Sequence, residues 1–232
     1  ARAVALRSPF DPVNMGLWCA RQVSTRYKDR ADSIAKVSDL LAVMAAAQPG
    51  HYLAFFPSYS YLQQVWEDFA ARYPDQPTLC QESAMDEGQR TEFLAQFLAR
   101  DGKPLLGFAV LGGVFGEGVD LTGESLIGVA VVSPGLPQIG PRQEQLRDYF
   151  EETRGAGFDY AYRYPGMNKV LQAAGRVIRT PQDRGVVLLI DDRFLAPDTR
   201  RLMPPHWEHL RVVDSADAWK DELAAFWKKH EP

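Results

Sequence analysis

The chain has 232 residues, of which 46% are hydrophobic and 24% are charged, and its formal net charge is −4 at pH 7. This composition is typical of a globular protein with one sizeable core, and it excludes disordered and fibrous classes. The negative net charge excludes nucleic-acid binding through a bulk basic surface, so any such contact must be local. No apolar run reaches the roughly 18 residues of a membrane span and no leader pattern is visible, so we expect a cytoplasmic protein with no membrane partner.

Strand-like and helix-like segments alternate along the chain, with short turns between them. The expected strands are 4–7, 17–23, 52–56, 78–81, 105–110, 126–133 and 185–190. The expected helices are 29–47, 61–72, 89–100, 142–153 and 168–178, with Ser58 and Asp86 as N-caps of the second and third. The run 126–133 is almost entirely apolar, as in a strand covered on both faces. This order predicts an α/β fold, a parallel sheet flanked by helices, in a single domain spanning 1–232.

The last segment, about 214–230, predicts an amphipathic helix that closes the chain. Trp219, Leu223, Phe226 and Trp227 fall at i, i+4, i+7 and i+8 and therefore share one face. We expect this face to pack on the same domain, and docking of a partner is the alternative.

Cysteine and histidine are too sparse for a metal site or a disulfide framework. Cys19 and Cys80 are the two cysteines, and we expect both to be buried free thiols. His206 and His209 have i, i+3 spacing but no carboxylate or cysteine nearby, which favours surface histidines over a metal site.

Three polar residues in the run 170–180 suggest a catalytic face. Gln172, Arg176 and Arg179 lie at i, i+4 and i+7, which on a helix places them on one side. Two arginines about one turn apart, next to Gly175, suit the anionic oxygens of a transferring phosphoryl group. The alternative is a solvated helix face or an ion pair with a neighbouring carboxylate.

A glycine-rich run, 112–120, follows the expected strand 105–110. Its glycines would let backbone amides approach a ligand closely, with Gly116, Glu117, Gly118 and Asp120 as candidate contacts. The alternative is a tight turn with a helix-capping or salt-bridging carboxylate.

The segment 55–59 places Ser58 and Tyr59 at a helix N-terminus, where free amides and the helix dipole favour a phosphate. Plain N-capping by Ser58 is the alternative. Farther along, aromatic residues interleave with arginines in a pattern suited to stacking on bases, although we expect most of these rings to be core. The rings are Tyr149, Phe150, Phe158, Tyr160, Tyr162 and Tyr164.

Two acidic–basic runs flank the last expected strand. Asp183 precedes Arg184, and Asp192 precedes Arg193. We expect each acid to neutralise the adjacent arginine, and we assign these residues no catalytic role.

Together, the runs 112–120 and 170–180 resemble motifs V and VI of superfamily 2 helicases of the DinG-type, XPD-like branch, and 55–59 resembles motif IV. Further resemblance extends from 8–11 to 191–194. It implies the second RecA-like lobe of an ATP-dependent DNA helicase that unwinds with 5′-to-3′ polarity in DNA repair or replication, and a location near the bacterial nucleoid. In such a lobe Arg176 and Arg179 would point at the γ-phosphate, with Arg179 as the arginine finger, and Gln172 would sense the nucleotide or order the attacking water.

The same resemblance implies the remaining contacts. Gly116, Glu117, Gly118, Asp120 and Gly175 would lie near the nucleotide, with Asp120 beside the ribose or the arginines and Glu117 able to do either job. Ser58, Tyr59 and Phe115 would contact single-stranded DNA.

No G-x-x-x-x-G-K-[ST] run and no D-E-x-H or D-E-x-D run occurs in the chain. We therefore expect ATP and Mg²⁺ to be held mainly by a first lobe that this chain lacks, and we expect the chain alone not to hydrolyse ATP. The start at Ala1 without Met fits a piece of a longer polypeptide. An iron–sulfur cluster, which needs four cysteines, would lie in the absent region. Two alternatives stay open: a RecA-like scaffold or binding module without motor activity, and RNA in place of DNA.

Overall fold

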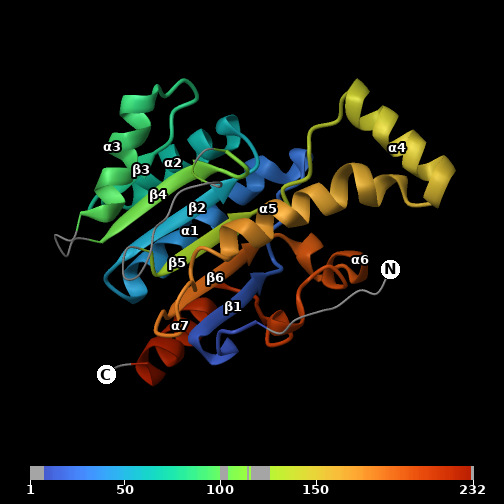
Figure 1. Cartoon of the computed structure of the whole chain (residues 1–232). Coiled ribbons are helices and arrows are strands. Elements are labelled where there is room, and N and C mark those ends of the chain that lie inside the picture. Colours follow the sequence, from blue (N-terminus) through green and yellow to red (C-terminus); the bar gives the residue numbers. More distant parts are fainter. Residues whose placement is uncertain (1–7, 100–103, 114, 116–125, 231–232) are drawn as a thin grey trace.

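The computed structural model describes residues 8–99, 104–113, 115 and 126–230. In this part of the chain seven strands form one fully parallel sheet, in the order β3-β4-β2-β5-β6-β1-β7 (Figure 1). The strands are β1 (Met15–Ala20), β2 (His51–Phe56), β3 (Thr78–Cys80), β4 (Leu105–Val110), β5 (Gly128–Val132), β6 (Gly185–Ile190) and β7 (Arg211–Val213). The predicted parallel α/β sheet is confirmed, and the predicted strand 4–7 lies outside the described residues.

Helices connect the strands as the sequence predicted. The α-helices are α1 (Arg30–Ala47), α2 (Tyr59–Arg72), α3 (Glu87–Leu98), α4 (Pro141–Arg154), α5 (Tyr164–Ala174), α6 (Pro197–Arg200) and α7 (Ala216–Lys229). Shorter helical segments are η1 (Pro12–Asn14), η2 (Tyr27–Asp29), η5 (Asp192–Leu195), η6 (Pro205–Trp207) and η4 (Asp159–Arg163), the last a π-helix. None of the helices in the described ranges combines the length and apolar character that crossing a lipid bilayer requires.

Both faces of the sheet are buried because successive side chains of each strand point to opposite sides. In β2, Leu53 and Phe55 join a core beneath α3 and α5, whereas Tyr52 and Phe56 join a second core beneath α1, α2 and α7. The apolar character of the central strands follows from this double coverage.

The predicted N-caps are confirmed. The Ser58 hydroxyl accepts from the Tyr61 backbone amide at 3.4 Å and opens α2. The Asp86 carboxylate accepts from the Gln89 amide at 2.8 Å, and the Gln89 side chain accepts from the Asp86 amide at 2.9 Å, which completes a capping box for α3.

Helix α7 packs on its own domain, as expected for its amphipathic face. Trp219 is fully buried, and its indole Nε1 donates to the Leu40 carbonyl oxygen of α1 at 3.2 Å. The Trp219 ring lies edge-on against Trp18 of β1, with 4.9 Å between ring centroids. Leu223 of the same face is also buried, whereas Phe226 and Trp227 are half-buried.

The loop, α4 and η4 that follow β5 form a projection from the sheet (Figure 1). None of the residues of α4 is buried, and the helix contacts mainly η4. This arrangement corrects the expectation that most aromatic rings in the segment are core. Of the six predicted rings only Tyr162 is buried, while Tyr149 and Phe158 are exposed.

Topology fixes two opposite ends of the sheet. All seven strands run in the same direction, so the segments that follow β1, β2, β5 and β6 lie at their carboxyl edge. Helix α5 returns from that edge to the amino end of β6, and the segment 175–184 therefore lies at the amino edge. The two sets of candidate residues, around Ser58 and around Arg179, occupy opposite ends of the strands.

Candidate functional site

The arginine run does not form one continuous helix face. Helix α5 ends at Ala174, and the Arg176 and Val177 amides donate to the Ala173 and Ala174 carbonyl oxygens, at 3.3 and 3.2 Å, in tighter three-residue turns. Residues after Ala174 therefore do not follow the 3.6-residue repeat of an α-helix. The prediction of a helix through 178, with Gln172, Arg176 and Arg179 on one side, is wrong.

The three polar residues also differ in exposure. Gln172 is exposed, Arg179 is half-buried, and Arg176 is 6% exposed. Arg176 and Arg179 both take part in interactions within the chain. Gly175 caps α5 and is exposed, so its backbone is open to solvent at this edge.

Asp183 fixes the turn that carries Arg179. Its carboxylate accepts from the backbone amides of Arg179 and Thr180, each at 2.8 Å, and from the Thr180 hydroxyl at 2.8 Å. Asp183 therefore binds backbone amides instead of neutralising Arg184 as expected, and Arg184 is exposed. Three hydrogen bonds to one carboxylate hold the Arg179 backbone in a defined position.

Beside this turn lies a cavity of about 440 Å³, which we call the amino-edge cleft. Its walls come from the segment before β1, the end of α5 and η6. They include Phe10, Met15, Gly175, Ile178 and Trp207. The cleft is mostly apolar, and it adjoins the helix end from which the arginine segment departs.

At the opposite end of the strands lies a larger cavity of about 700 Å³, which we call the carboxyl-edge groove. The segments that build it follow β1, β2, β5 and β6, and α4 and η4 complete it. Its lining residues are Thr25, Arg26, Tyr27, Arg30, Pro57, Ser58, Ser60, Ser133, Leu136, Pro137, Gln138, Ile139, Glu144, Arg147, Phe158, Tyr162 and Arg193. Of the two motif IV candidates, Ser58 lines the groove. The Tyr59 hydroxyl instead accepts from the Gln81 side-chain amide at 3.0 Å.

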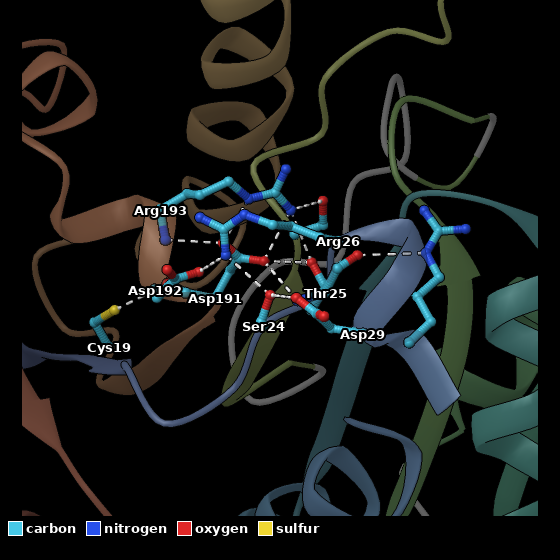
Figure 2. A network of polar contacts seen from close by, with 10 residues as sticks. Cys19, Ser24, Thr25, Arg26, Asp29, Asp191, Asp192 and Arg193 are labelled. Atoms are coloured by element: carbon cyan, nitrogen blue, oxygen red, sulfur yellow. Dashed lines mark hydrogen bonds and ion pairs between the residues drawn. The ribbon is translucent and has the colours of Figure 1, made fainter. Parts of the chain in front are cut away.

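A buried polar network lies where the groove meets the sheet (Figure 2). Asp191, which is fully buried, accepts from Arg193 Nε at 2.7 Å and Nη2 at 2.8 Å. It also accepts from the Thr25 amide at 2.9 Å and from the Thr25 hydroxyl. Burial raises the pKa of Asp191, but the Arg193 hydrogen bonds and charge, aided by Thr25, outweigh it and hold the pKa below its ordinary value.

This network was not predicted. The expected partner of Arg193 was Asp192, yet Asp192 pairs with Arg26 at 2.5 Å instead. One contact of the network joins Thr25 to Asp191, which are 166 positions apart in the sequence. Pairing each arginine with the adjacent acidic residue therefore gave the wrong partner for Arg193. A carboxylate at the end of the apolar run 185–190 was the available signal, because a charge next to a buried strand needs a partner.

Ser133, directly after β5, adopts φ of +86°, a region that residues with a side chain rarely occupy. Its hydroxyl accepts from Arg193 Nη2 at 3.5 Å, and its amide donates to the Ile190 carbonyl oxygen at 3.1 Å. Backbone strain of this kind costs about 1–3 kcal/mol and is found most often at ligand-binding loops. Here it directs the chain from the sheet into the wall of the groove.

Phe115 does not reach the groove. Its ring is 1% exposed and packs on Phe93, with 4.2 Å between ring centroids. This placement in the core corrects the expectation that Phe115 contacts nucleic acid. Gly116, Glu117, Gly118 and Asp120 lie outside the described residues.

No group of three or more metal-ligating side chains occurs within the described ranges. His209 Nε2 lies 2.8 Å from the Met15 carbonyl oxygen, so this imidazole has a backbone partner. Burial raises the pKa of both thiols, Cys19 and Cys80, to about 12. Cys19 is buried as expected, whereas Cys80 is half-buried. The two cysteines of the sequence are fewer than the four thiolates that an iron–sulfur cluster needs.

Comparison with known proteins identifies related sequences over most of the chain. Residues 41–210 match the family described as a helicase C-terminal domain. The regulator of telomere elongation helicase 1 of Bos taurus is 30% identical over 223 residues, which cover 88% of this chain and 18% of that protein. The ATP-dependent DNA helicase YoaA of Escherichia coli (strain K12) is 28% identical over 198 residues, which cover 84% of this chain and 29% of that protein. The chain thus spans less than a third of the length of these relatives.

Solved structures share the fold. The structure titled XPD_APO superimposes with a TM-score of 0.68 at 18% identity, over 87% of this chain and 40% of that one. The structure of S. tokodaii Xpd4 gives 0.62 at 16% identity, over 86% and 38%. At this identity the likeness establishes the RecA-like architecture alone.

Proposed function

The chain belongs to the DinG/XPD-type helicase C-terminal domain family, and we propose that it is the second motor lobe of an ATP-dependent DNA helicase. In this role it closes on a nucleotide held by a first, Walker-motif lobe. It supplies Arg179 as an arginine finger and contacts single-stranded DNA at Ser58. The unwinding polarity we propose is 5′ to 3′, in DNA repair or replication.

The observation that carries this proposal is the position of Arg179. The residue is half-buried at the amino edge, in a turn that Asp183 holds by three hydrogen bonds, two from backbone amides and one from the Thr180 hydroxyl. A guanidinium on a fixed backbone loses little freedom when it meets a phosphoryl group, which is the condition for stabilising developing charge. Arg176, being buried, is better placed to support this turn than to reach across to another lobe.

The chain's own residues fit a shared site rather than a complete one. The sequence has no phosphate-binding loop, so in this proposal the other lobe holds the phosphates of ATP and the bound Mg²⁺. What remains for this chain is to place positive charge beside the transferring group, with Gln172 and the exposed Gly175 backbone facing the same edge. The relatives named as DNA helicases support DNA as the substrate.

The arginine finger is tested by ATP hydrolysis in the protein that joins this chain to a Walker-motif lobe, with single-stranded DNA present. Arg179→Ala lowers kcat by about 10³-fold or more, since an arginine finger contributes about 10³ to 10⁵ in rate. KM for ATP changes little, because the contact forms mainly in the transition state. Arg184→Ala, an exposed arginine five positions farther on, is the matched control and keeps wild-type kcat.

An unchanged kcat in Arg179→Ala would refute the finger assignment. The scaffold alternative makes a different prediction: the joined protein would hydrolyse no ATP, even with Arg179 and Arg184 both present.

A further inference from the structure

Gln81, the residue directly after β3, has a buried side chain that forms hydrogen bonds to two other segments. The residue is 5% exposed. Its Oε1 accepts from the Val110 amide at 2.8 Å, and its Nε2 donates to the Tyr59 hydroxyl at 3.0 Å. Because a backbone amide can only donate, the Val110 contact determines which end of the Gln81 amide is the oxygen. The planar amide group therefore joins Val110 to Tyr59 in one defined orientation.

The bond to Val110 takes the place of a sheet contact at the end of β3. The Leu106 amide of β4 donates to the Pro77 carbonyl oxygen at 3.1 Å, and the Gln81 amide donates to the Phe108 carbonyl oxygen at 2.9 Å. Such bonds are evenly spaced along a parallel pair, so the next partner of β4 would be the backbone oxygen of residue 81. The Gln81 side-chain oxygen takes that position. The amide at the end of β4 is thus satisfied where β3 has already ended.

The turn 110–113 leads out of β4 and is held from both sides. Gly112 has a φ of +73°, a conformation that glycine adopts at little cost. On one side, the Leu111 amide donates to the Phe56 carbonyl oxygen of β2 at 2.8 Å. On the other side, Gln81 holds the first residue of the turn. The position of the turn therefore depends on the Gln81 side chain.

The same turn lies against α5. A Cβ added at Gly112 would lie 2.8 Å from Lys169 Cδ, so the turn and the Lys169 side chain are in close contact. Gln172 is about one helical turn farther along α5 and lies on the same side. The helix ends at Ala174, beside the exposed Gly175 backbone. A displacement of the turn would therefore push on the helix that leads to the amino edge.

Tyr59 is the other partner of Gln81. It is the first residue of α2, next to Ser58, and it is 38% exposed, while its hydroxyl is held by Gln81. Hydrogen bonds are strongly directional, and burial makes them stronger than in water. A ligand that contacts the start of α2 therefore meets a segment that is tied, through Gln81, to the end of β4.

We propose that Gln81 is a positioning residue that couples single-stranded DNA at the start of α2 to ATP hydrolysis at the amino edge. The coupling runs from the Tyr59 hydroxyl through the Gln81 amide to the turn 110–113, and from this turn to α5. This inference rests on the proposed function and adds to it a means by which DNA at one end of the strands regulates catalysis at the other.

The coupling is measured in the protein that joins this chain to a Walker-motif lobe. The readout, which we call the stimulation ratio, is kcat with saturating single-stranded DNA divided by kcat without DNA. Gln81→Met keeps an unbranched side chain of similar length but removes both hydrogen bonds. It lowers the stimulation ratio about fivefold or more and keeps kcat without DNA within about twofold of wild type, as expected for a residue that modulates coupling. Saturating DNA removes any change in DNA affinity from the ratio.

Three further variants separate coupling from stability. Tyr59→Phe removes only a hydroxyl and lowers the stimulation ratio as Gln81→Met does. Gln81→Glu keeps both contacts, because one carboxylate oxygen accepts from the Val110 amide and the Tyr59 hydroxyl turns to donate to the other. It therefore retains the wild-type ratio. Tyr73→Phe is the matched control, since it removes a hydroxyl that donates to Asp39 at the far end of α2, and it leaves the ratio unchanged.

Melting temperatures of all variants show which of them are folded, and Tyr59→Phe decides the question if Gln81→Met unfolds. The coupling is overturned if both variants keep the wild-type ratio. It is also overturned if Gln81→Met lowers kcat with and without DNA by the same factor, which is the result of a merely structural role.

The outcome for the wild-type joined protein separates this inference from the proposed function. ATP hydrolysis that does not respond to DNA overturns the coupling and leaves the arginine finger intact, because Arg179→Ala tests the finger through kcat itself. A joined protein that hydrolyses no ATP overturns the proposed function, and this inference with it.

Discussion

Asp191 and Arg193 form a two-point ion pair at the end of β6, in which the Asp191 carboxylate accepts from Arg193 Nε at 2.7 Å and from Nη2 at 2.8 Å. The carboxylate is fully buried and also accepts from Thr25, in the segment after β1 (Figure 2). The pair therefore ties together the ends of two neighbouring strands of the sheet. Both Thr25 and Arg193 line the carboxyl-edge groove, so this pair determines the shape of its floor.

Removing the charge of Asp191 leaves Arg193 without its partner in a largely buried position. We expect Asp191→Asn to lower the free energy of unfolding by about 3 kcal/mol, at the lower end of the range for breaking one side of a buried pair. Asp192→Asn, which breaks the half-exposed pair with Arg26, is the control and costs less than about 1 kcal/mol. Urea unfolding of the three proteins measures the difference, and equal losses in the two variants would contradict the account.

The same carboxylate predicts a pH dependence. Because the contacts of Arg193 and Thr25 hold the folded-state pKa of Asp191 below its ordinary value, its stabilising effect is complete above the unfolded-state pKa of about 4. It is lost as the pH falls through the lower folded-state pKa. We expect the free energy of unfolding to decline more steeply below about pH 4 in the wild-type chain than in Asp191→Asn. Parallel declines, measured by urea unfolding across this range, would show that Asp191 is not the responsible group.

Several elements could be predicted closely from sequence. Strands 105–110 and 185–190 have the predicted limits. Each is a short apolar run, and the proline, glycine or charged residue at its ends marks where the buried strand begins or ends. The caps at Ser58 and Asp86 followed from local hydrogen bonding alone. Strand β7 was missed because its three residues, Arg211–Val213, pair only on one side at the sheet edge and show no period.

The candidate sites were predicted less well, for reasons that lie in tertiary structure. The spacing of Gln172, Arg176 and Arg179 suits a helix, but Gly175 ends it, since glycine costs about 1 kcal/mol in a helix interior. The burial of Arg176 and the Asp191 network depend on contacts that only the folded sheet creates. Arg30 carried no motif, and its position between two tyrosine rings emerges from the packing of α1 on α2.

Trp219 anchors α7 to the rest of the domain. Trp219→Ala removes a fully buried ring and its hydrogen bond to Leu40, and we expect it to cost about 3–5 kcal/mol in the free energy of unfolding. Lys220→Ala, on the exposed side of the same helix, changes stability by less than about 0.5 kcal/mol. Chemical unfolding gives both values, and a small loss for Trp219→Ala would mean that α7 contributes little to the domain.

The two thiols are expected to be slow nucleophiles. Burial raises the pKa of Cys19 and Cys80 to about 12, so little thiolate exists near pH 8. Alkylation by iodoacetamide at pH 8 therefore modifies the folded chain slowly and the unfolded chain at two sites, as counted by mass spectrometry. Rapid modification of the folded chain at Cys19 would contradict its burial.

Comparing ATP hydrolysis in three samples, each with single-stranded DNA present, decides whether this chain provides half of an ATP site. These are the 232-residue chain alone, a Walker-motif lobe alone, and the two lobes in one polypeptide. We expect hydrolysis in the joined protein alone, and loss of that hydrolysis in Arg179→Ala. Robust hydrolysis by the isolated chain, abolished by Arg179→Ala, would contradict it.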